Sequence, residues 1–197
     1  MTEQTTQKKY ELLKDDTVEH FGRTLYRIKA LITFGLVGAG QLGGYIETEK
    51  NLDHSGNAWV YDNALVYGDA RVYGNACVYD NALVYGDARV YGNAQVYGNA
   101  RVFGNAWMCG NARVFGNAWV RSFAVISERK MIFWASNVGS ENGTLTVSNG
   151  KFGLIVTRGC FTGTVDEFLS KSKEVHDDKT HHEYKLLIEV AQSRILN

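Results

Sequence analysis

A six-residue repeat occupies the middle of this chain and strongly limits what the chain can fold into. Alanine recurs at every sixth position from Ala58 to Ala124, and an aliphatic residue or Met follows two positions after each alanine. Tyr or Phe usually comes next, followed by Gly-Asn, Gly-Asp or Asp-Asn. A fixed period of this kind indicates an array of stacked units, so it has to be interpreted before any local propensity.

The order of residues within one unit predicts a short strand followed by a corner. Small and aliphatic residues alternate with variable and aromatic ones, which is the period of two that a strand shows. The Gly-Asn and Asp-Asn pairs tolerate a left-handed backbone and suit a turn. Because two-residue hairpins cannot join parallel strands within one flat sheet, we expect a coil with three short sides. Residues eighteen apart would then stack about 4.8 Å from each other.

The array resembles the hexapeptide-repeat proteins, whose unit places a small residue four positions after an aliphatic one. Val60 and Ala64 match that unit, as do Val66 and Ala70 and their successors. The resemblance implies a left-handed parallel β-helix, although crossover connections in general are right-handed. Twelve units make about four coils. Their interior would be a thin, dry core of Val and Ala without room for a buried ligand.

The segments on either side of the array lack the repeat and predict different structures. Residues 1–57 contain short apolar runs, including 31–34, and should form an N-terminal cap over the open edge of the first coil. After the array at 58–129, residues 130–197 contain strand-like runs that predict a small antiparallel unit. A capping box at Thr164–Glu167 begins a helix to about Val175, and a second amphipathic helix follows the polar stretch 176–180. The predicted fold is therefore mainly β, with a C-terminal α+β segment that ends in two helices.

Counting by eighteen assigns the outward-pointing residues to three sides of the coil. The first side carries Trp59, Cys77, Gln95 and Arg113, and its flanking ladder consists of Tyr61, Tyr79, Tyr97 and Phe115. We expect that ladder to form a subunit interface around a two- or three-fold axis, in a dimer or trimer. The second side carries Leu65 and Leu83, and we expect the C-terminal helices to cover it.

The third side combines basic and aromatic residues, namely Arg71, Arg89, Tyr73, Tyr91 and Trp107. Guanidinium groups pair with phosphate, and aromatic rings stack on planar bases. This side is therefore predicted to bind an anionic, planar ligand or a protein partner. A long nucleic acid is not expected, because Lys plus Arg and Asp plus Glu both number 21 and a duplex requires a larger basic surface.

Enzymatic chemistry has weak support in the sequence. Hexapeptide acyltransferases use a His base, but no His lies between residues 55 and 175. A terminal histidine could still reach a neighbouring subunit, so acyl transfer remains an alternative, as does a self-assembling scaffold. A polar stretch offers two potential metal ligands on one turn but is interpreted as a solvated loop. Neither a metal nor a cofactor is expected. The histidines considered for acyl transfer are His54, His176, His181 and His182, and the polar stretch considered for a metal contains His176, Asp177, Asp178, His181 and His182.

A second resemblance covers about residues 25–195. The stretches 43–47 and 159–168 are similar to hypothetical hexapeptide-repeat proteins of phages and prophages. This resemblance implies no catalytic activity. An odd count of three cysteines fits free thiols in a reducing compartment. With no apparent leader or membrane span, we expect a cytoplasmic, non-enzymatic binding protein that sequesters a host defence protein or nucleotide signal.

Overall fold

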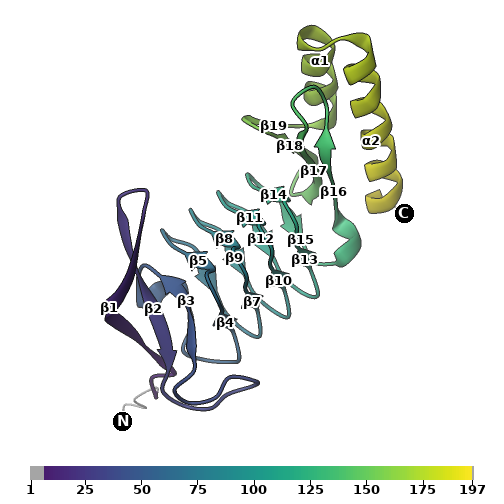
Figure 1. Cartoon of the computed structure of the whole chain (residues 1–197). Coiled ribbons are helices and arrows are strands. Elements are labelled where there is room, and N and C mark those ends of the chain that lie inside the picture. The colour runs from purple at the N-terminus through teal and green to yellow at the C-terminus, as the bar shows by residue number, and fades with distance from the viewer. Residues whose placement is uncertain (1–6, 197) are drawn as a thin grey trace.

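The computed structural model describes residues 7–196 and shows a β-solenoid between an N-terminal hairpin and a C-terminal sheet with two helices (Figure 1). The N-terminal elements are β1 (Tyr10–His20), β2 (Arg23–Ala30), β3 (Leu42–Ile46) and the short 3-10 helix η1 (Glu49–Asn51). Residues 1–6 of the predicted cap and residue 197 lie outside the described part of the chain.

Twelve two-residue strands build the solenoid, one from each hexad. They are β4 (Trp59–Val60), β5 (Leu65–Val66), β6 (Arg71–Val72), β7 (Cys77–Val78), β8 (Leu83–Val84), β9 (Arg89–Val90), β10 (Gln95–Val96), β11 (Arg101–Val102), β12 (Trp107–Met108), β13 (Arg113–Val114), β14 (Trp119–Val120) and β15 (Val125–Ile126). These strands form three parallel ladders, in which each residue pairs with the one eighteen positions later, such as Arg71 with Arg89.

We call the three ladders flats and number them by the predicted sides. The first flat is β4-β7-β10-β13, the second is β5-β8-β11-β14 and the third is β6-β9-β12-β15. We call each strand of a flat a rung. Strand β3 adds a rung to the second flat, and Leu52 bridges to Val72 beside the third flat. The solenoid therefore has about five turns, one more than the hexads alone predict, because residues 42–52 pair like a coil without carrying the repeat.

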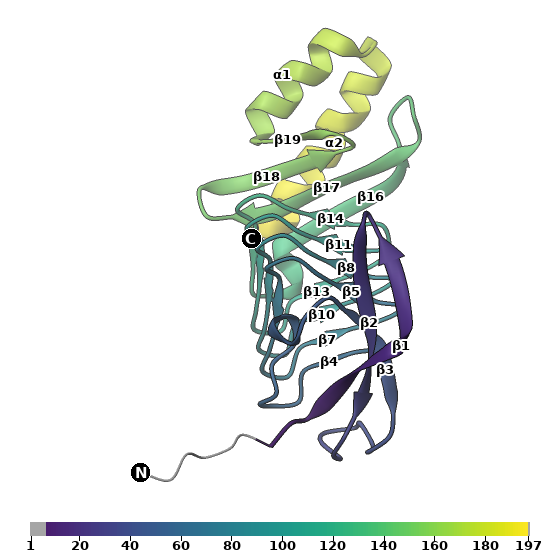
Figure 2. The ribbon, with the colours of Figure 1, turned by 90° about the vertical axis from the view of Figure 1, so that its left-hand side faces the viewer.

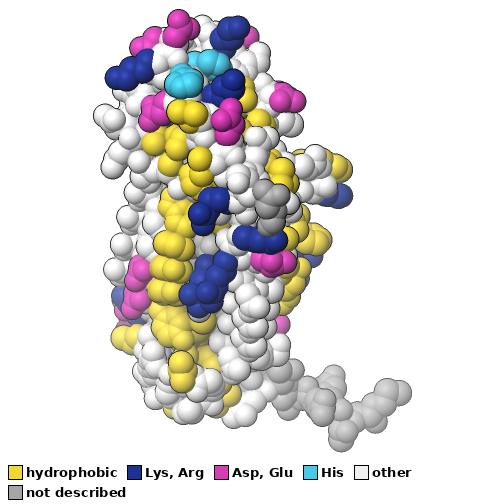
Figure 3. All heavy atoms as spheres, turned by 90° about the vertical axis from the view of Figure 1, so that its right-hand side faces the viewer, with side chains coloured by type: hydrophobic (Ala, Val, Ile, Leu, Met, Phe, Trp, Pro, Cys, Tyr) yellow, Lys and Arg dark blue, Asp and Glu magenta, His cyan; other side chains and the backbone are white. Residues whose placement is uncertain are grey.

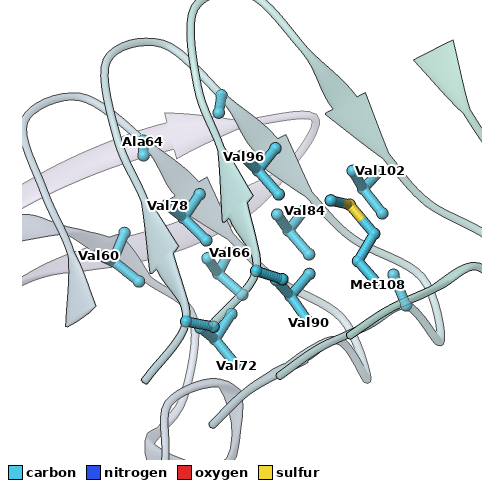
Figure 4. Close-up of a cluster of buried hydrophobic side chains, with 14 of the residues drawn as sticks. Val60, Ala64, Val66, Val72, Val78, Val84, Val90, Val96, Val102 and Met108 are labelled. Carbon is cyan, nitrogen blue, oxygen red and sulfur yellow. The ribbon is translucent and has the colours of Figure 1, made fainter. Parts of the chain in front are cut away.

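The core of the solenoid is the predicted stack of Val and Ala. Every repeat alanine from Ala58 to Ala124 is fully buried, and the aliphatic positions are at most 1% exposed. Their side chains point to the axis of the coil (Figure 4). Positive φ angles at the corners, such as 71° at Gly74 and 59° at Asp80, explain the Gly-Asn and Asp-Asn pairs. Hydrogen-bonded asparagines join successive corners, as from Asn75 to Asn93 at 3.1 Å.

The N-terminal hairpin covers the second flat. Strands β1 and β2 pair antiparallel, β2 pairs with β3, and β3 joins β5 in parallel (Figure 2). Leu25 of β2 packs on Leu65 and Tyr67. The prediction that the C-terminal helices cover this side is therefore wrong. The physical reason is sheet continuity, since β3 carries the hairpin onto the edge of the same ladder.

The underside of the first coil is closed by the segment that begins at Lys9. The Lys9 Nζ donates to the Ala58 carbonyl at 2.9 Å, and Tyr10 Oη donates to the Leu52 carbonyl at 2.6 Å. Trp59 was expected to point outward, but it is fully buried against Tyr10 and Phe34. The apolar run 31–34 lies in the cap as expected, but it contains no strand and forms one isolated bridge, between Phe34 and Val37. These corrections share a cause, because a cap must bury the first coil's open end.

The C-terminal segment is the predicted antiparallel unit with two helices. After the 3-10 helix η2 (Arg129–Met131), the strands are β16 (Ile132–Val138), β17 (Gly143–Gly150), β18 (Gly153–Arg158) and β19 (Phe161–Gly163). Helices α1 (Val165–Val175) and α2 (Asp178–Leu196) pack on this sheet through Phe168 and Tyr184.

The capping box at the start of α1 is confirmed, with the Glu167 amide donating to Thr164 Oγ1 at 3.2 Å. Helix α2 begins earlier than predicted, so His181 and His182 lie on a helix rather than in a linker. Its cap explains this start, because the Thr180 amide donates to Asp177 Oδ1 at 2.8 Å. In the part of the chain described, no helix is long and apolar enough to cross a membrane.

Candidate functional site

The third flat places two arginines on adjacent rungs. Arg71 of β6 pairs in register with Arg89 of β9, and Arg89 pairs with Trp107 of β12. Rungs lie about 4.8 Å apart, so the two guanidinium groups project from neighbouring backbones in the same direction. The other two flats differ, since Arg101 faces Leu83 and Trp119, and Arg113 faces Gln95.

Two hollows lie along the third flat and share Arg89. The lower hollow, near the N-terminal cap, has a volume of about 460 Å³ and is lined by Glu49, Lys50, Leu52, Asp53, His54, Arg71, Val72, Tyr73 and Arg89. The upper hollow, near the C-terminal sheet, has a volume of about 630 Å³ and is lined by Asp87, Arg89, Asn105, Trp107, Phe123, Val125 and Lys151. Because they share Arg89, we treat the two hollows as one surface feature and call it the third-flat groove.

The arginines of the groove form no ion pair. Neither Arg71 nor Arg89 takes part in one within residues 7–196, although Glu49, Asp53 and Asp87 line the same two hollows. At the lower end Glu49 is already engaged, because it lies 2.8 Å from Lys8 Nζ and 3.6 Å from His54 Nε2. Asp53 accepts the Ser55 amide at 3.0 Å. The groove therefore offers cations to an incoming anion.

Aromatic rings support these arginines. The guanidinium of Arg89 lies 5.3 Å from the centroid of the Trp107 ring, a cation–π contact. Tyr73 and Tyr91 stack at 4.8 Å with an interplanar angle of 2°. The pKa of Tyr91 is raised, mainly by a hydrogen bond with Cys109 and to a smaller extent by burial. These contacts restrict the side chains and so prearrange the groove for a ligand.

The structure brings together most of the residues predicted for this site. Arg71, Arg89 and Tyr73 line the lower hollow, and Trp107 joins Arg89 in the upper one. Tyr91 lines neither hollow and acts as the stacking partner of Tyr73.

Sequence reasoning did not assign Lys50, Phe123 or Lys151 to this site, and it considered His54 only as a potential catalytic base. The cap supplies Lys50 and His54, the last coil supplies Phe123, and Lys151 follows β17. The one signal for any of them is that the repeat breaks at residues 121–123. The Lys151 amide then donates to the Phe123 carbonyl at 2.9 Å and holds the two residues together.

The aromatic ladder of the first flat forms a second exposed feature. Tyr79 and Tyr97 stack at 4.8 Å, Tyr97 and Phe115 stack at 4.9 Å, and Trp134 closes the ladder edge-on. Tyr61 packs against the core instead of continuing the stack. Figure 3 shows one side of the molecule, where a hydrophobic stripe runs along the solenoid beside clustered Lys and Arg side chains. Phe115 remains 38% exposed beside Trp134.

The histidines are spread over the two ends of the molecule. His54 stacks on Tyr10, its Nδ1 accepts the Lys9 amide at 3.2 Å, and its Nε2 is buried. Neither nitrogen of His54 is therefore presented to a ligand in the groove. His181 Nδ1 lies 3.2 Å from Ser172 Oγ, and His176 packs against Tyr184. Within residues 7–196, no three potential metal ligands gather at one point.

The stacked hexads and the three parallel ladders define a β-solenoid repeat protein. A family model described as the YdcK beta solenoid repeat matches the array in five stretches, which are residues 58–74, 70–86, 76–92, 94–110 and 108–122. The match supports the repeat β-helix and is confined to the solenoid. No curated protein is similar enough to the chain to count as a match.

Proposed function

We propose that this chain is a non-enzymatic binding protein whose third-flat groove takes up an anionic partner. The observation that carries the proposal is the register pair of Arg71 and Arg89, which have no carboxylate partner within residues 7–196. Like charges directly opposite each other destabilise a sheet. Proteins retain such local conflicts mainly where a site needs them.

The similarity to phage and prophage hexapeptide-repeat proteins extends this proposal to a biological role. We propose an accessory protein that sequesters a host component, either a nucleotide signal or a defence protein, in the host cytoplasm. A stiff solenoid suits sequestration, because little conformational entropy is lost when a prearranged surface binds. His54 gives acyl transfer no support at the groove, because its Nδ1 accepts the Lys9 amide and its Nε2 is buried.

The anion site can be tested with inorganic pyrophosphate as the probe, using isothermal titration calorimetry. Replacing both arginines, Arg71→Glu and Arg89→Glu, should weaken binding at least tenfold, since charge-assisted hydrogen bonds contribute about 1.5–3 kcal/mol each. Two glutamates in register repeat the like-charge contact between neighbouring strands, although they lose the contact of Arg89 with the Trp107 ring. Arg113→Glu on the first flat serves as the control and should bind pyrophosphate like the wild type.

Unchanged pyrophosphate binding in the double variant would remove the basis of the proposal. Native mass spectrometry of the protein purified from its host cells addresses the sequestering role. It should show a bound small molecule or a partner protein in stoichiometric amount, and the double variant should lose that species.

A further inference from the structure

We infer that the ligand of the third-flat groove is a small nucleotide, with its phosphates on Arg71 and Arg89 and its base against Trp107 and Phe123. This inference rests on the proposed anion site and specifies its ligand. The groove contains two chemically different halves in line, a cationic lower hollow and an aromatic upper hollow, and Arg89 belongs to both.

The lower half suits a phosphate chain. Arg71 and Arg89 stand on rungs about 4.8 Å apart, so two adjacent phosphate groups can each meet one guanidinium. Lys50 lines the same hollow and adds a third cation. Arg89 lies over the Trp107 ring, so it is positioned before a ligand arrives.

The upper half suits a planar, apolar ring. Trp107 is 42% exposed and Phe123 is 48% exposed, although both are large hydrophobic side chains. Both line the upper hollow together with Val125, and the polar side chains of Asn105 and Lys151 stand at the same hollow. Exposed aromatic rings at a hollow provide stacking surfaces for a base, and the neighbouring amide and ammonium groups can hydrogen-bond to its edge.

The ends of the groove limit the ligand to a short molecule. Residues 49–54 line its lower end, and Lys151, which follows β17, lines its upper end. From Arg71 to Val125 the groove spans three rung intervals, or about 14 Å. A groove of this length holds a mononucleotide or dinucleotide, whereas a polymer would have to continue past the segments that line its two ends. Acidic side chains also line the hollows, namely Glu49 and Asp53 in the lower one and Asp87 in the upper one, so Arg71, Arg89 and Lys50 have to outweigh them at the phosphates.

The test compares inorganic pyrophosphate with adenosine, guanosine, cytidine and uridine diphosphates by titration calorimetry on the full chain. At least one nucleotide should bind about tenfold more tightly than pyrophosphate, because stacking adds to the phosphate contacts. Phe123→Ala should remove that advantage and leave pyrophosphate binding unchanged. Phe21→Ala, at the exposed tip of the β1–β2 turn, is the matched control and should retain it.

The outcomes separate this inference from the proposed function. If pyrophosphate binds as tightly as all four nucleotides, or if Phe123→Ala changes nothing, the anion site stands and the nucleotide assignment is wrong. If a single-stranded oligonucleotide binds more tightly than every mononucleotide, the assignment to a small ligand is also wrong. If neither pyrophosphate nor any nucleotide binds, both proposals fail together.

Discussion

The phenol of Tyr67 lies where the N-terminal hairpin meets the second flat. Its ring stacks on Tyr85 at 5.0 Å, His20 packs edge-on at 5.2 Å, and Leu25 joins the same cluster. Only 7% of the Tyr67 side chain is exposed. This burial, with a smaller contribution from Tyr85, raises the pKa of Tyr67 from 10.0 to about 12. The neutral phenol is thus the form that the folded chain accommodates.

This burial predicts a loss of stability in alkaline solution. The unfolded chain releases the Tyr67 proton near its ordinary pKa of 10.0, whereas the folded chain keeps it to about 12. The contribution is complete below pH 10 and is lost as the pH rises through about 12. Tyr67→Phe should make the fall in unfolding free energy smaller, by on the order of 1 kcal/mol between about pH 9 and about pH 11.5. Urea denaturation of the wild type and the variant at both pH values measures this fall. An identical fall in both proteins would contradict the raised pKa of Tyr67.

Among the structural elements, the corners between strands determine how closely successive coils can approach each other. Gly110 has a φ of 54°, and a Cβ placed there would lie 2.5 Å from the Ser127 carbonyl oxygen. Gly68 has a similar φ of 69°, but the nearest atom to its Cβ position is the Gly86 amide nitrogen at 3.3 Å. The two corners therefore have similar backbone strain but differ in the space available for a Cβ atom.

We expect Gly110→Ala to destabilise the fold more than Gly68→Ala. The left-handed backbone alone costs about 1–2 kcal/mol for alanine, which both variants bear. At Gly110 the carbonyl contact adds to this, so the loss should be roughly 3 kcal/mol against roughly 1 kcal/mol at Gly68. Chemical denaturation of the two variants gives the comparison. Equal losses would show that the last coil shifts freely to make room.

In the whole molecule, the three flats differ in which part of the chain covers them. The hairpin lies on the second flat, the third carries the groove, and the first presents the ladder of Tyr79, Tyr97 and Phe115. Large exposed aromatic stripes are uncommon on monomers. We therefore propose, as the sequence predicts, that the first flat meets its equivalent in a second or third copy of the chain.

Sedimentation equilibrium tests that proposal. The wild type should show two or three times the chain mass of 22.0 kDa, and Phe115→Glu should return it to a single chain. The charge would be buried without a partner in the assembly, which is strongly unfavourable. Phe152→Glu is the control, because Phe152 is 80% exposed on the C-terminal sheet. A wild type that remains monomeric at high concentration would contradict the proposed interface.

The hexad period was sufficient to predict the solenoid, its core and the register of its flats. Strand alternation determines that Val90 points inward and Arg89 outward, and the eighteen-residue turn determines that Arg89 stacks on Arg71. These are local consequences of backbone geometry, which recur wherever the unit recurs. The sequence alone therefore places Arg71, Arg89 and Trp107 on one face. The left hand of the coil, taken from a family resemblance, stays a prediction.

Only the tertiary structure decided which flat is covered and how the groove is completed. The hairpin lies on the second flat because β3 extends that ladder. Residues 42–46 do not carry the repeat, so the sequence pattern does not predict this pairing. His54 and Lys151 joined the groove from segments on either side of the array. Such contacts depend on how non-repeating segments fold back over the coil. The sequence by itself thus determined the periodic interior and faces, whereas long-range packing determined their cover and the ends of the site.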